Sequence, residues 1–131
     1  MAEFLAKNDK RTKYCGEFTK EDIGKEAVVM GWVQRQRDLG SLIFIDLRDR
    51  TGIVQLAFDE NTDKTVFDKA FQTRSEYVLC VHGIVRSRGE GAINKNIPTG
   101  EIEIAVSSFK ILGTAETPAF EIVENSDVRT D

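Results

Sequence analysis

Apolar and polar side chains alternate in two short runs of the chain, at positions 42–48 and 53–58. Successive side chains of a β-strand point to opposite faces of a sheet, so each run predicts a strand with one buried face. The residues between the runs, 49–52, have turn composition, and together the runs predict a β-hairpin. The residues on its predicted core face are Ile43, Ile45, Leu47, Val54, Leu56 and Phe58.

The opposite face of this hairpin is expected to meet solvent, and its composition is unusual. Phe44 lies on it beside Gln55, with guanidinium groups nearby. This combination suits an unstacked base, because the ring stacks on the base and the amide hydrogen-bonds to its edge. Two alternatives stay open: Phe44 packs under a loop, and Gln55 is a surface amide without a role. Each arginine has the alternative of a solvated salt bridge to Asp38, Asp46 or Asp49.

The order of the predicted elements indicates the fold. Strands are predicted at 26–35, 42–48, 53–58, 77–86 and 101–105, and 109–112 could extend the last one. A helix capped at 61–63 is predicted to run to about 74, with one helical turn near 19–24 and loops at 37–41 and 89–100. Three strands, a helix and two strands predict an all-β fold, a five-stranded Greek-key OB-fold barrel with one helix between strands three and four. In that fold, strands two and three bind oligonucleotides on the face where Phe44 and Gln55 are expected.

Other residues with distinctive side chains are predicted to have structural roles and no role in a site. Trp32 shares its strand face with apolar neighbours and is predicted to lie in or beside the core. His82 is in the middle of a strand and is interpreted as a sheet-surface histidine. Cys15 and Cys80 have no CxxC spacing and no nearby histidine, so both are predicted to be reduced.

Composition places the chain among ordinary globular proteins. Its 131 residues, 40% hydrophobic and 31% charged, predict a single domain. No apolar run is long enough to span a bilayer and the N-terminus lacks a signal-peptide pattern, so a cytoplasmic protein is expected. No catalytic constellation, phosphate-binding loop or metal-ligand spacing is visible, and neither a cofactor nor enzymatic activity is expected of this chain alone.

Charge distribution is compatible with a small RNA footprint. Residues 116–131 contribute the whole net charge of −4, which leaves the first 115 residues neutral. The basic residues at predicted strand ends and loops are Arg35, Arg37, Arg48, Arg50, Arg86, Arg88 and Lys95. Such a local basic face suits a specific RNA contact better than the coating of DNA, and no DNA partner is expected.

Several motifs resemble one known family. They are Arg11-Thr12-Lys13-Tyr14-Cys15-Gly16-Glu17, Gly31-Trp32-Val33, Arg37-Asp38-Leu39-Gly40, Leu42-Ile43-Phe44-Ile45-Asp46-Leu47-Arg48-Asp49, Gly52-Ile53-Val54-Gln55, Arg74-Ser75-Glu76-Tyr77 and Thr99-Gly100-Glu101-Ile102-Glu103. From about residue 11 to 120, the chain resembles the N-terminal anticodon-binding domain of bacterial-type aspartyl-tRNA synthetases.

The resemblance implies roles for individual residues. Phe44 would stack on the central uridine of the aspartate anticodon, and Gln55 would hydrogen-bond to the same base. Arg37 would contact the bases or backbone of the loop. Arg86 and Arg88 leave the end of the fourth predicted strand toward the same face, where the family also contacts the loop.

Other positions qualify the resemblance. Glu103 would accept hydrogen bonds from a guanine edge. The segment Arg35-Gln36-Arg37 replaces three consecutive basic residues that are common in the family, so Arg35 is kept as a binding residue while one phosphate contact is lost. Leu39 and Ala92 leave open whether tRNA-Asn is excluded.

The resemblance also implies a domain organisation. Residues 1–13 are expected to be a flexible extension, 14–113 the OB-fold domain, and 114–131 the start of a linker to a catalytic domain outside this chain. That class II domain would use ATP and magnesium to attach aspartate to tRNA-Asp, and would form a homodimer. This chain would contribute the contact with the anticodon loop of tRNA-Asp and have no membrane association.

Two other functions remain open from the residues. A general single-stranded nucleic-acid-binding OB-fold protein would ordinarily present more stacking platforms and more positive charge. A protein-interaction OB module would present an apolar patch on strands two and three, where Phe44 is instead expected among polar groups.

Overall fold

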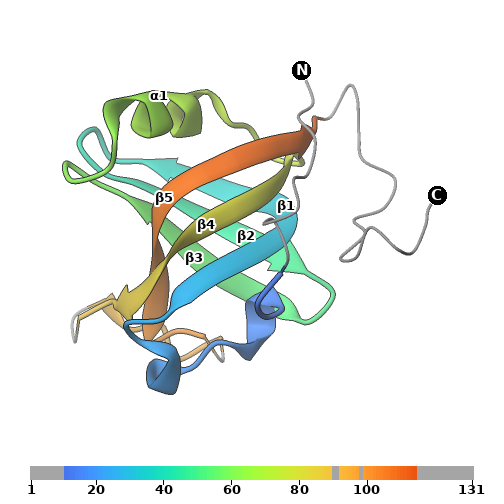
Figure 1. Cartoon of the computed structure of the whole chain (residues 1–131), viewed down its shortest axis with the longest axis vertical. Coiled ribbons are helices and arrows are strands. Elements are labelled where there is room, and N and C mark those ends of the chain that lie inside the picture. The colour runs from blue at the N-terminus through green and yellow to red at the C-terminus, as the bar shows by residue number, and fades with distance from the viewer. Residues whose placement is uncertain (1–10, 90–91, 98, 115–131) are drawn as a thin grey trace.

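Five strands close into a barrel in the order β1-β2-β3-β5-β4 (Figure 1). The computed structural model describes residues 11–89, 92–97 and 99–114. The strands are β1 (Glu26–Asp38), β2 (Ile43–Asp49), β3 (Gly52–Phe58), β4 (Val78–Ser87) and β5 (Ile102–Gly113), with helix α1 (Lys64–Gln72) and 3-10 turns η1 (Cys15–Glu17) and η2 (Lys20–Asp22). The predicted five-stranded OB-fold barrel, with its helix between β3 and β4, is confirmed.

The long strand β1 pairs with two neighbours and curves around the barrel. Its first half pairs with β4 and its second half with β2, and Trp32 has a partner in both ladders. A register shift between Val33 and Arg35 marks a β-bulge, which increases the local bend and twist. The predicted loop at 37–41 is wrong at its start, because the ladder continues to Asp38 and pairs Arg37 with Phe44.

Strand β5 is also longer than predicted. It runs unbroken along β4, with register shifts between Val78 and Leu79 and between His82 and Gly83. These irregularities let one strand bend where the sequence pattern indicated two pieces. The bend brings backbone close to backbone at Gly83, where an added Cβ would lie 2.4 Å from the carbonyl oxygen of Ala105.

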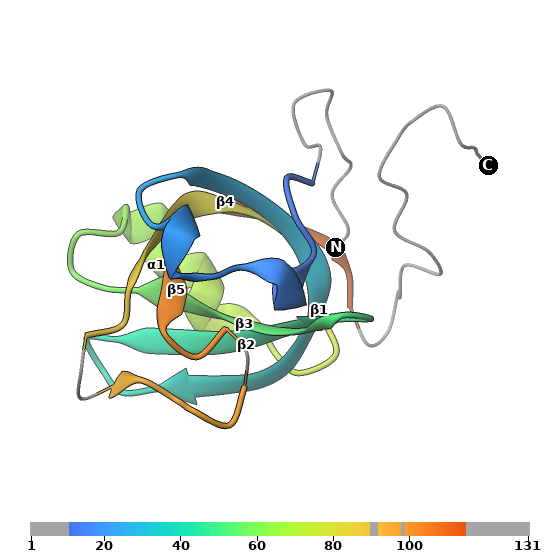
Figure 2. The same cartoon turned by 90° about the horizontal axis from the view of Figure 1, so that it is seen from below.

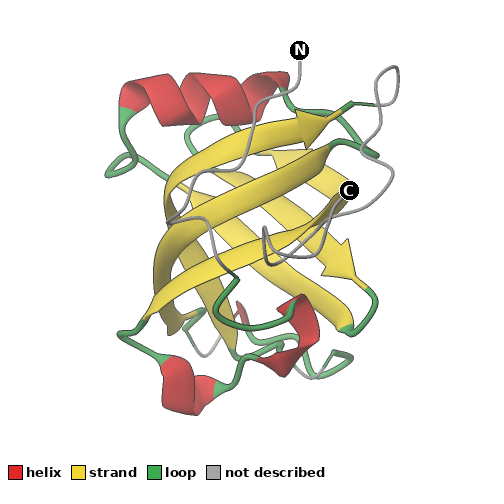
Figure 3. Cartoon of the chain, turned by 45° about the vertical axis from the view of Figure 1, so that its right-hand side comes forward, coloured by secondary structure: helices red, strands yellow, loops and turns green. Residues whose placement is uncertain are grey.

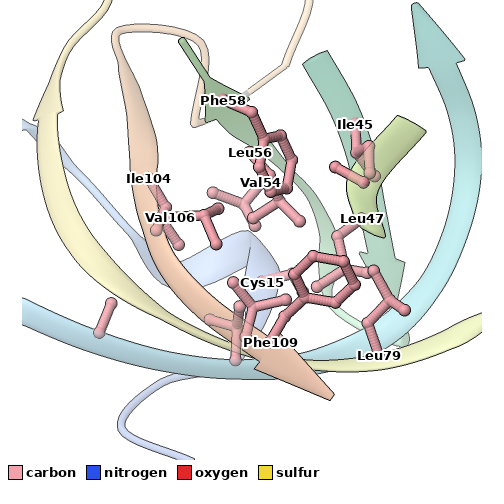
Figure 4. Packing of buried hydrophobic residues seen from close by; sticks show 14 of the residues in the cluster. Cys15, Ile45, Leu47, Val54, Leu56, Phe58, Leu79, Ile104, Val106 and Phe109 are labelled. Atoms are coloured by element: carbon pink, nitrogen blue, oxygen red, sulfur yellow. The ribbon is translucent and has the colours of Figure 1, made fainter. Parts of the chain in front are cut away.

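The barrel interior is filled by the residues that alternation assigned to it. Ile43, Ile45 and Leu47 of β2 are fully buried, as are Val54 and Leu56 of β3. Figure 4 shows side chains from these strands converging with Cys15 and Phe109 inside the barrel. The rings of Phe58 and Phe109 meet edge to face, with their centroids 5.8 Å apart. Cys15 and Cys80 are both buried, and neither forms a disulfide with a described residue.

Trp32 lies on the outer surface, so the prediction that it lies in or beside the core is wrong. Its side chain is 36% exposed, whereas Val28 and Met30 on the same outer face are buried. The difference arises because the N-terminal segment covers Val28, where the amide of Thr12 donates to the Val28 carbonyl oxygen. Leu112 packs against Val28 and Met30 on the same face. Residues 11–13 are therefore held against β1, and the rest of the expected extension lies outside the described residues.

Helix α1 lies at one end of the barrel and the two short turns lie at the other (Figure 3). The helix is capped by Asp63, whose carboxylate accepts from the amide of Thr65. At its other end, the Gln36 side chain of β1 donates to the carbonyl oxygens of Ala70 and Thr73. The predicted turn near 19–24 is confirmed as η2, with a capping box between Thr19 and Asp22. In the described part of the chain, no helix is both long and apolar enough to cross a membrane.

Asp49 joins the β2–β3 turn to the N-terminal segment. Its carboxylate accepts from the amide of Cys15 at 2.7 Å, the amide of Thr51 at 2.8 Å and the Thr51 hydroxyl at 2.6 Å. Burial raises the pKa of Asp49, but the hydrogen bonds from Thr51 and Cys15 outweigh burial and hold the pKa below its ordinary value.

We predict that Asp49→Asn lowers the free energy of unfolding at neutral pH by about 1–2 kcal/mol. Because the pKa is lower in the folded state, the carboxylate stabilises the fold above its unfolded-state pKa, and this contribution disappears as pH falls through the folded-state value. The stabilities of wild type and variant should therefore converge below about pH 4. Urea unfolding at a series of pH values measures both. The control Asp68→Asn, on the exposed surface of α1, should stay within about 0.5 kcal/mol of wild type, and a constant gap for Asp49→Asn across pH would contradict the assignment.

Candidate nucleic-acid interface

Strand register aligns a row of polar side chains across the outer face of the barrel. Asp46 of β2 pairs with Arg35 of β1 on one side and with Gln55 of β3 on the other. Across the parallel β3–β5 seam, Leu56 pairs with Ile104, which places the preceding residues, Gln55 and Glu103, next to each other. Glu103 in turn pairs with Arg86 of β4. The row therefore crosses all five strands.

Hydrogen bonds link this row into a chain. Arg37 donates to the amide oxygen of Gln55 at 2.8 Å, and the amide nitrogen of Gln55 donates to Glu103 at 2.8 Å. The other oxygen of Glu103 accepts from Arg86 at 2.7 Å, and Arg86 also donates to Asp59 at 3.1 Å. Five side chains from four segments of the chain thereby hold one another in place.

The Gln55 side chain is buried, at 4% exposed, so the prediction that it faces open solvent is wrong. Its burial follows from its place at the seam, between neighbours on β2 and β5. Both ends of the amide are bonded, but the nitrogen keeps a second N–H and the oxygen a second lone pair. A reversed amide would set its N–H groups against Arg37 and its oxygen against the Glu103 carboxylate. The two neighbours therefore fix which end of the amide faces which way.

Phe44 lies beside this chain and is half-buried. The guanidinium carbon of Arg37 is 5.3 Å from the centroid of its ring, within the range of a cation–π contact. Arg37 also forms a salt bridge with Asp46, with 3.4 Å between the guanidinium nitrogen and the carboxylate oxygen. This salt bridge is one of the alternatives that the sequence left open for an arginine on this face. The arginine therefore links the aromatic ring to Gln55.

A cavity of about 460 Å³ opens over these residues. Its walls come from β1, β2, β3 and the β4–β5 loop, and its lining residues are Gln34, Arg35, Arg37, Phe44, Asp46, Ile53, Gln55, Arg88, Ala92, Asn94 and Ile97. Figure 2 shows the β4–β5 loop beside β2 and β3. The loop is anchored by Thr99, whose hydroxyl donates to the carbonyl oxygen of Ile53, and by Gly100, where an added Cβ would collide with the Asn94 carbonyl.

The two arginines at the end of β4 differ in their surroundings. Burial lowers the pKa of Arg88, whose Nε donates a hydrogen bond to the carbonyl oxygen of Ile102. Burial also lowers the pKa of Arg86, but the hydrogen bonds and charges of Glu103 and Asp59 outweigh burial and raise it. The positive charge of Arg86 is thus balanced by two carboxylates, whereas Arg88 lines the cavity.

The structure brings together most of the residues that the sequence indicated. Phe44, Gln55, Arg37, Arg35 and Arg88 line the cavity. Two predicted residues do not line it: Glu103 is bonded to Gln55 from β5, and Arg86 is bonded to Glu103 one strand further away. The sequence pattern did not indicate Asp59 and Gln34 as site residues, because Asp59 follows a strand end and Gln34 lies at a bulge that shifts the alternation.

The fold and the site define a class of protein. A closed five-stranded barrel carries, over strands two and three, a cavity lined by an aromatic ring, an amide and arginines from the neighbouring segments. This is the arrangement of an OB-fold that binds single-stranded nucleic acid.

Comparison with known proteins narrows the class. Residues 27–112 match the family of tRNA anticodon domains described as OB-fold nucleic acid binding domain. The chain is 53% identical over 118 residues to an aspartate–tRNA(Asp/Asn) ligase of Geobacillus sp. (strain WCH70) and 55% identical over 118 residues to an aspartate–tRNA ligase of Ruminiclostridium cellulolyticum. Each match covers 90% of this chain and 20% of the relative.

A solved structure agrees with these sequence matches. The asparaginyl-tRNA synthetase of Pyrococcus horikoshii in complex with asparaginyl-adenylate superposes with a TM-score of 0.65 at 30% identity, covering 90% of this chain and 25% of that one. The chain therefore belongs to the OB-fold nucleic acid binding domain family, as an anticodon-binding domain of the aspartate–tRNA ligase type.

We predict that Glu103 and Arg86 are energetically coupled. Glu103→Ala leaves the buried Gln55 amide and Arg86 without their shared acceptor, and should lower the free energy of unfolding by about 1–3 kcal/mol. A double-mutant cycle with Arg86→Ala, measured by urea unfolding, should give a coupling energy above about 0.5 kcal/mol. The control Glu101→Ala removes an exposed carboxylate from the same strand end and should have little effect. Additive effects of Glu103→Ala and Arg86→Ala would contradict the chain of hydrogen bonds.

Proposed function

We propose that this chain recognises the anticodon loop of tRNA-Asp in the cavity over β2 and β3. The observation that supports this function most directly is the Gln55 amide, fixed between Arg37 and Glu103 next to the Phe44 ring. A base that stacks on Phe44 can meet the remaining hydrogen-bonding positions of Gln55. Stacking then supplies affinity and the amide supplies selection among bases.

The orientation of Gln55 favours uridine over cytidine. Uridine presents an acceptor oxygen next to an N–H donor, whereas cytidine presents an amino donor next to an acceptor nitrogen. One amide could match either base by turning over. Because Arg37 needs the oxygen and Glu103 needs the amino group, turning over would break two hydrogen bonds. Where stacking on Phe44 holds the base in one orientation, an amide fixed in this way matches only one of the two patterns, and we propose that it is the uridine pattern.

The other predicted residues have supporting roles in this proposal. Arg35 and Arg88 line the cavity, and in this proposal their guanidinium groups bind phosphates of the loop. Glu103 retains lone pairs beyond those used by Gln55 and Arg86, with which it can accept from a guanine edge. Arg86 acts on the loop through Glu103, which it holds in place.

The activity of the whole protein is a further part of the proposal. The chain spans about one fifth of the length of the curated relatives it matches. Attachment of aspartate to tRNA, with ATP and magnesium, belongs to the remainder of such a protein, as does formation of a homodimer. We expect this chain alone to bind the anticodon loop without catalysing the reaction, in the cytoplasm and with no DNA partner.

We predict that Phe44→Ala weakens binding of an aspartate anticodon stem-loop by about 1–3 kcal/mol, because one base loses its stacking partner. Titration at fixed salt, followed by fluorescence anisotropy of labelled RNA, measures the change. The control Phe71→Ala removes a ring that is 53% exposed on α1 and does not line the cavity, and should leave the affinity unchanged. Equal affinity of Phe44→Ala and wild type would rule out stacking on this ring.

We predict that wild type binds the uridine-containing stem-loop more tightly than one with cytidine at the central position, and that Gln55→Ala removes most of this preference. The expected discrimination of wild type is about 1–3 kcal/mol, as for one paired base edge. Gln72→Ala, at the exposed end of α1, is the matched control. A variant without Gln55 that still prefers uridine would show that another group selects the base, and poly-uridine binding as tight as the stem-loop would favour a general single-strand-binding protein.

A further inference from the structure

A second group of cationic and aromatic side chains lies near the β2–β3 turn, outside the cavity. It consists of Arg11, Tyr14, Trp32, Arg48 and Arg50, here called the basic–aromatic patch. The Tyr14 ring has the guanidinium carbons of Arg11 and Arg50 each 4.4 Å from its centroid. Trp32 and Arg48 are paired directly across β1 and β2, a position that brings their Cβ atoms within about 5.5 Å.

Two arginines of the patch, Arg48 and Arg50, keep their positive charge. Neither Arg48 nor Arg50 forms an ion pair with a described residue, in contrast to Arg37 and Arg86, which are paired with carboxylates. The carboxylate nearest in sequence, Asp49, is 7% exposed and is turned toward the backbone of the N-terminal segment. A concentrated positive charge on a chain of net charge −4 indicates a surface that meets an anionic partner.

The patch is continuous with the cavity. Gln34, at the bulge of β1, lines the cavity and accepts a hydrogen bond from the Nε of Arg48. Phe44 and Arg48 lie on the same outer face of β2, four residues apart, which corresponds to about 13 Å along a strand. An RNA strand held at Phe44 and extended along β2 therefore passes over Arg48.

We propose that the basic–aromatic patch binds the sugar–phosphate backbone of the nucleotides that flank those held in the cavity. Arg48 and Arg50 provide guanidinium groups that match phosphate oxygens in pairs, and the exposed edge of Trp32 contacts the sugar or base beside them. This contact adds affinity without selecting sequence, because it engages the backbone. The inference rests on the proposed recognition of RNA in the cavity.

The test removes the charge of the patch and measures the salt dependence of binding. The double variant Arg48→Gln with Arg50→Gln is titrated with the aspartate anticodon stem-loop at several salt concentrations. Each phosphate contact contributes about 0.7–0.9 to the slope of log affinity against log salt, so the slope should fall by about 1–2. At low salt the affinity should fall about tenfold or more, equally for loops with uridine and with cytidine at the central position.

Two control proteins separate a contact from a general effect of charge. Lys20→Gln with Lys64→Gln makes the same change in net charge at exposed sites on η2 and α1, and should leave the slope near that of wild type. Arg48→Lys with Arg50→Lys keeps the charge and should retain most of the slope. Urea unfolding of each protein confirms that the comparison is made between folded barrels.

The possible outcomes distinguish this inference from the proposed function. Wild-type affinity and slope in the glutamine double variant, with the uridine preference intact, would overturn the patch contact and leave the proposed function standing. An equal loss in the Lys20 and Lys64 control would also overturn it. If the wild type binds the uridine and cytidine loops equally well, this result would count against the proposed function and not against the patch contact.

Discussion

Closure of the barrel between β3 and β5 is the constraint on which the site depends. These strands are parallel and share a short ladder, from Leu56–Ile104 to Ala57–Ala105. Closure places Gln55 beside Glu103, residues that are 48 positions apart in the chain and joined by a buried hydrogen bond. Without this seam the hairpin of β2 and β3 would still present Phe44 and Gln55, but the amide would keep only Arg37 and lose Glu103 as a partner.

The buried hydrogen-bond chain lowers the stability of the fold somewhat, but it holds each of its side chains in one orientation. Polar groups removed from water stabilise little and are costly when a partner is missing. In return, each group in the chain has one arrangement that satisfies its neighbours, from Arg37 through Gln55 and Glu103 to Arg86. An amide with a fixed orientation distinguishes bases that a free amide would accept equally. The buried hydrogen bonds that cost stability are therefore the same bonds that make the Gln55 amide selective.

In the proposed function, two parts of one surface contribute differently to RNA binding. The cavity has a ring, an amide and walls from four segments, which suits recognition of individual bases. The basic–aromatic patch has cationic groups and an exposed ring along the same strand, which suits the backbone. A small acidic chain can bind a polyanion in this way because only its local charge faces the ligand.

The sequence alone determined which residues face the core and which strands exist, because the alternation of apolar side chains along a strand is a local property. Along β2 burial follows this alternation at every second position. It also indicated Phe44 and Gln55 as a pair, since the two strands are joined by a short turn and register follows from turn length. The bulge at Gln34, the continuation of β1 through Arg37 and the unbroken β5 were not predicted, because each depends on how neighbouring strands bend around the barrel. Only the closed barrel decided that Gln55 is buried, that Glu103 and Arg86 stand behind it, and that Trp32 faces outward. These outcomes depend on contacts between residues distant in the chain, and no local pattern encodes which of them barrel closure will bring together.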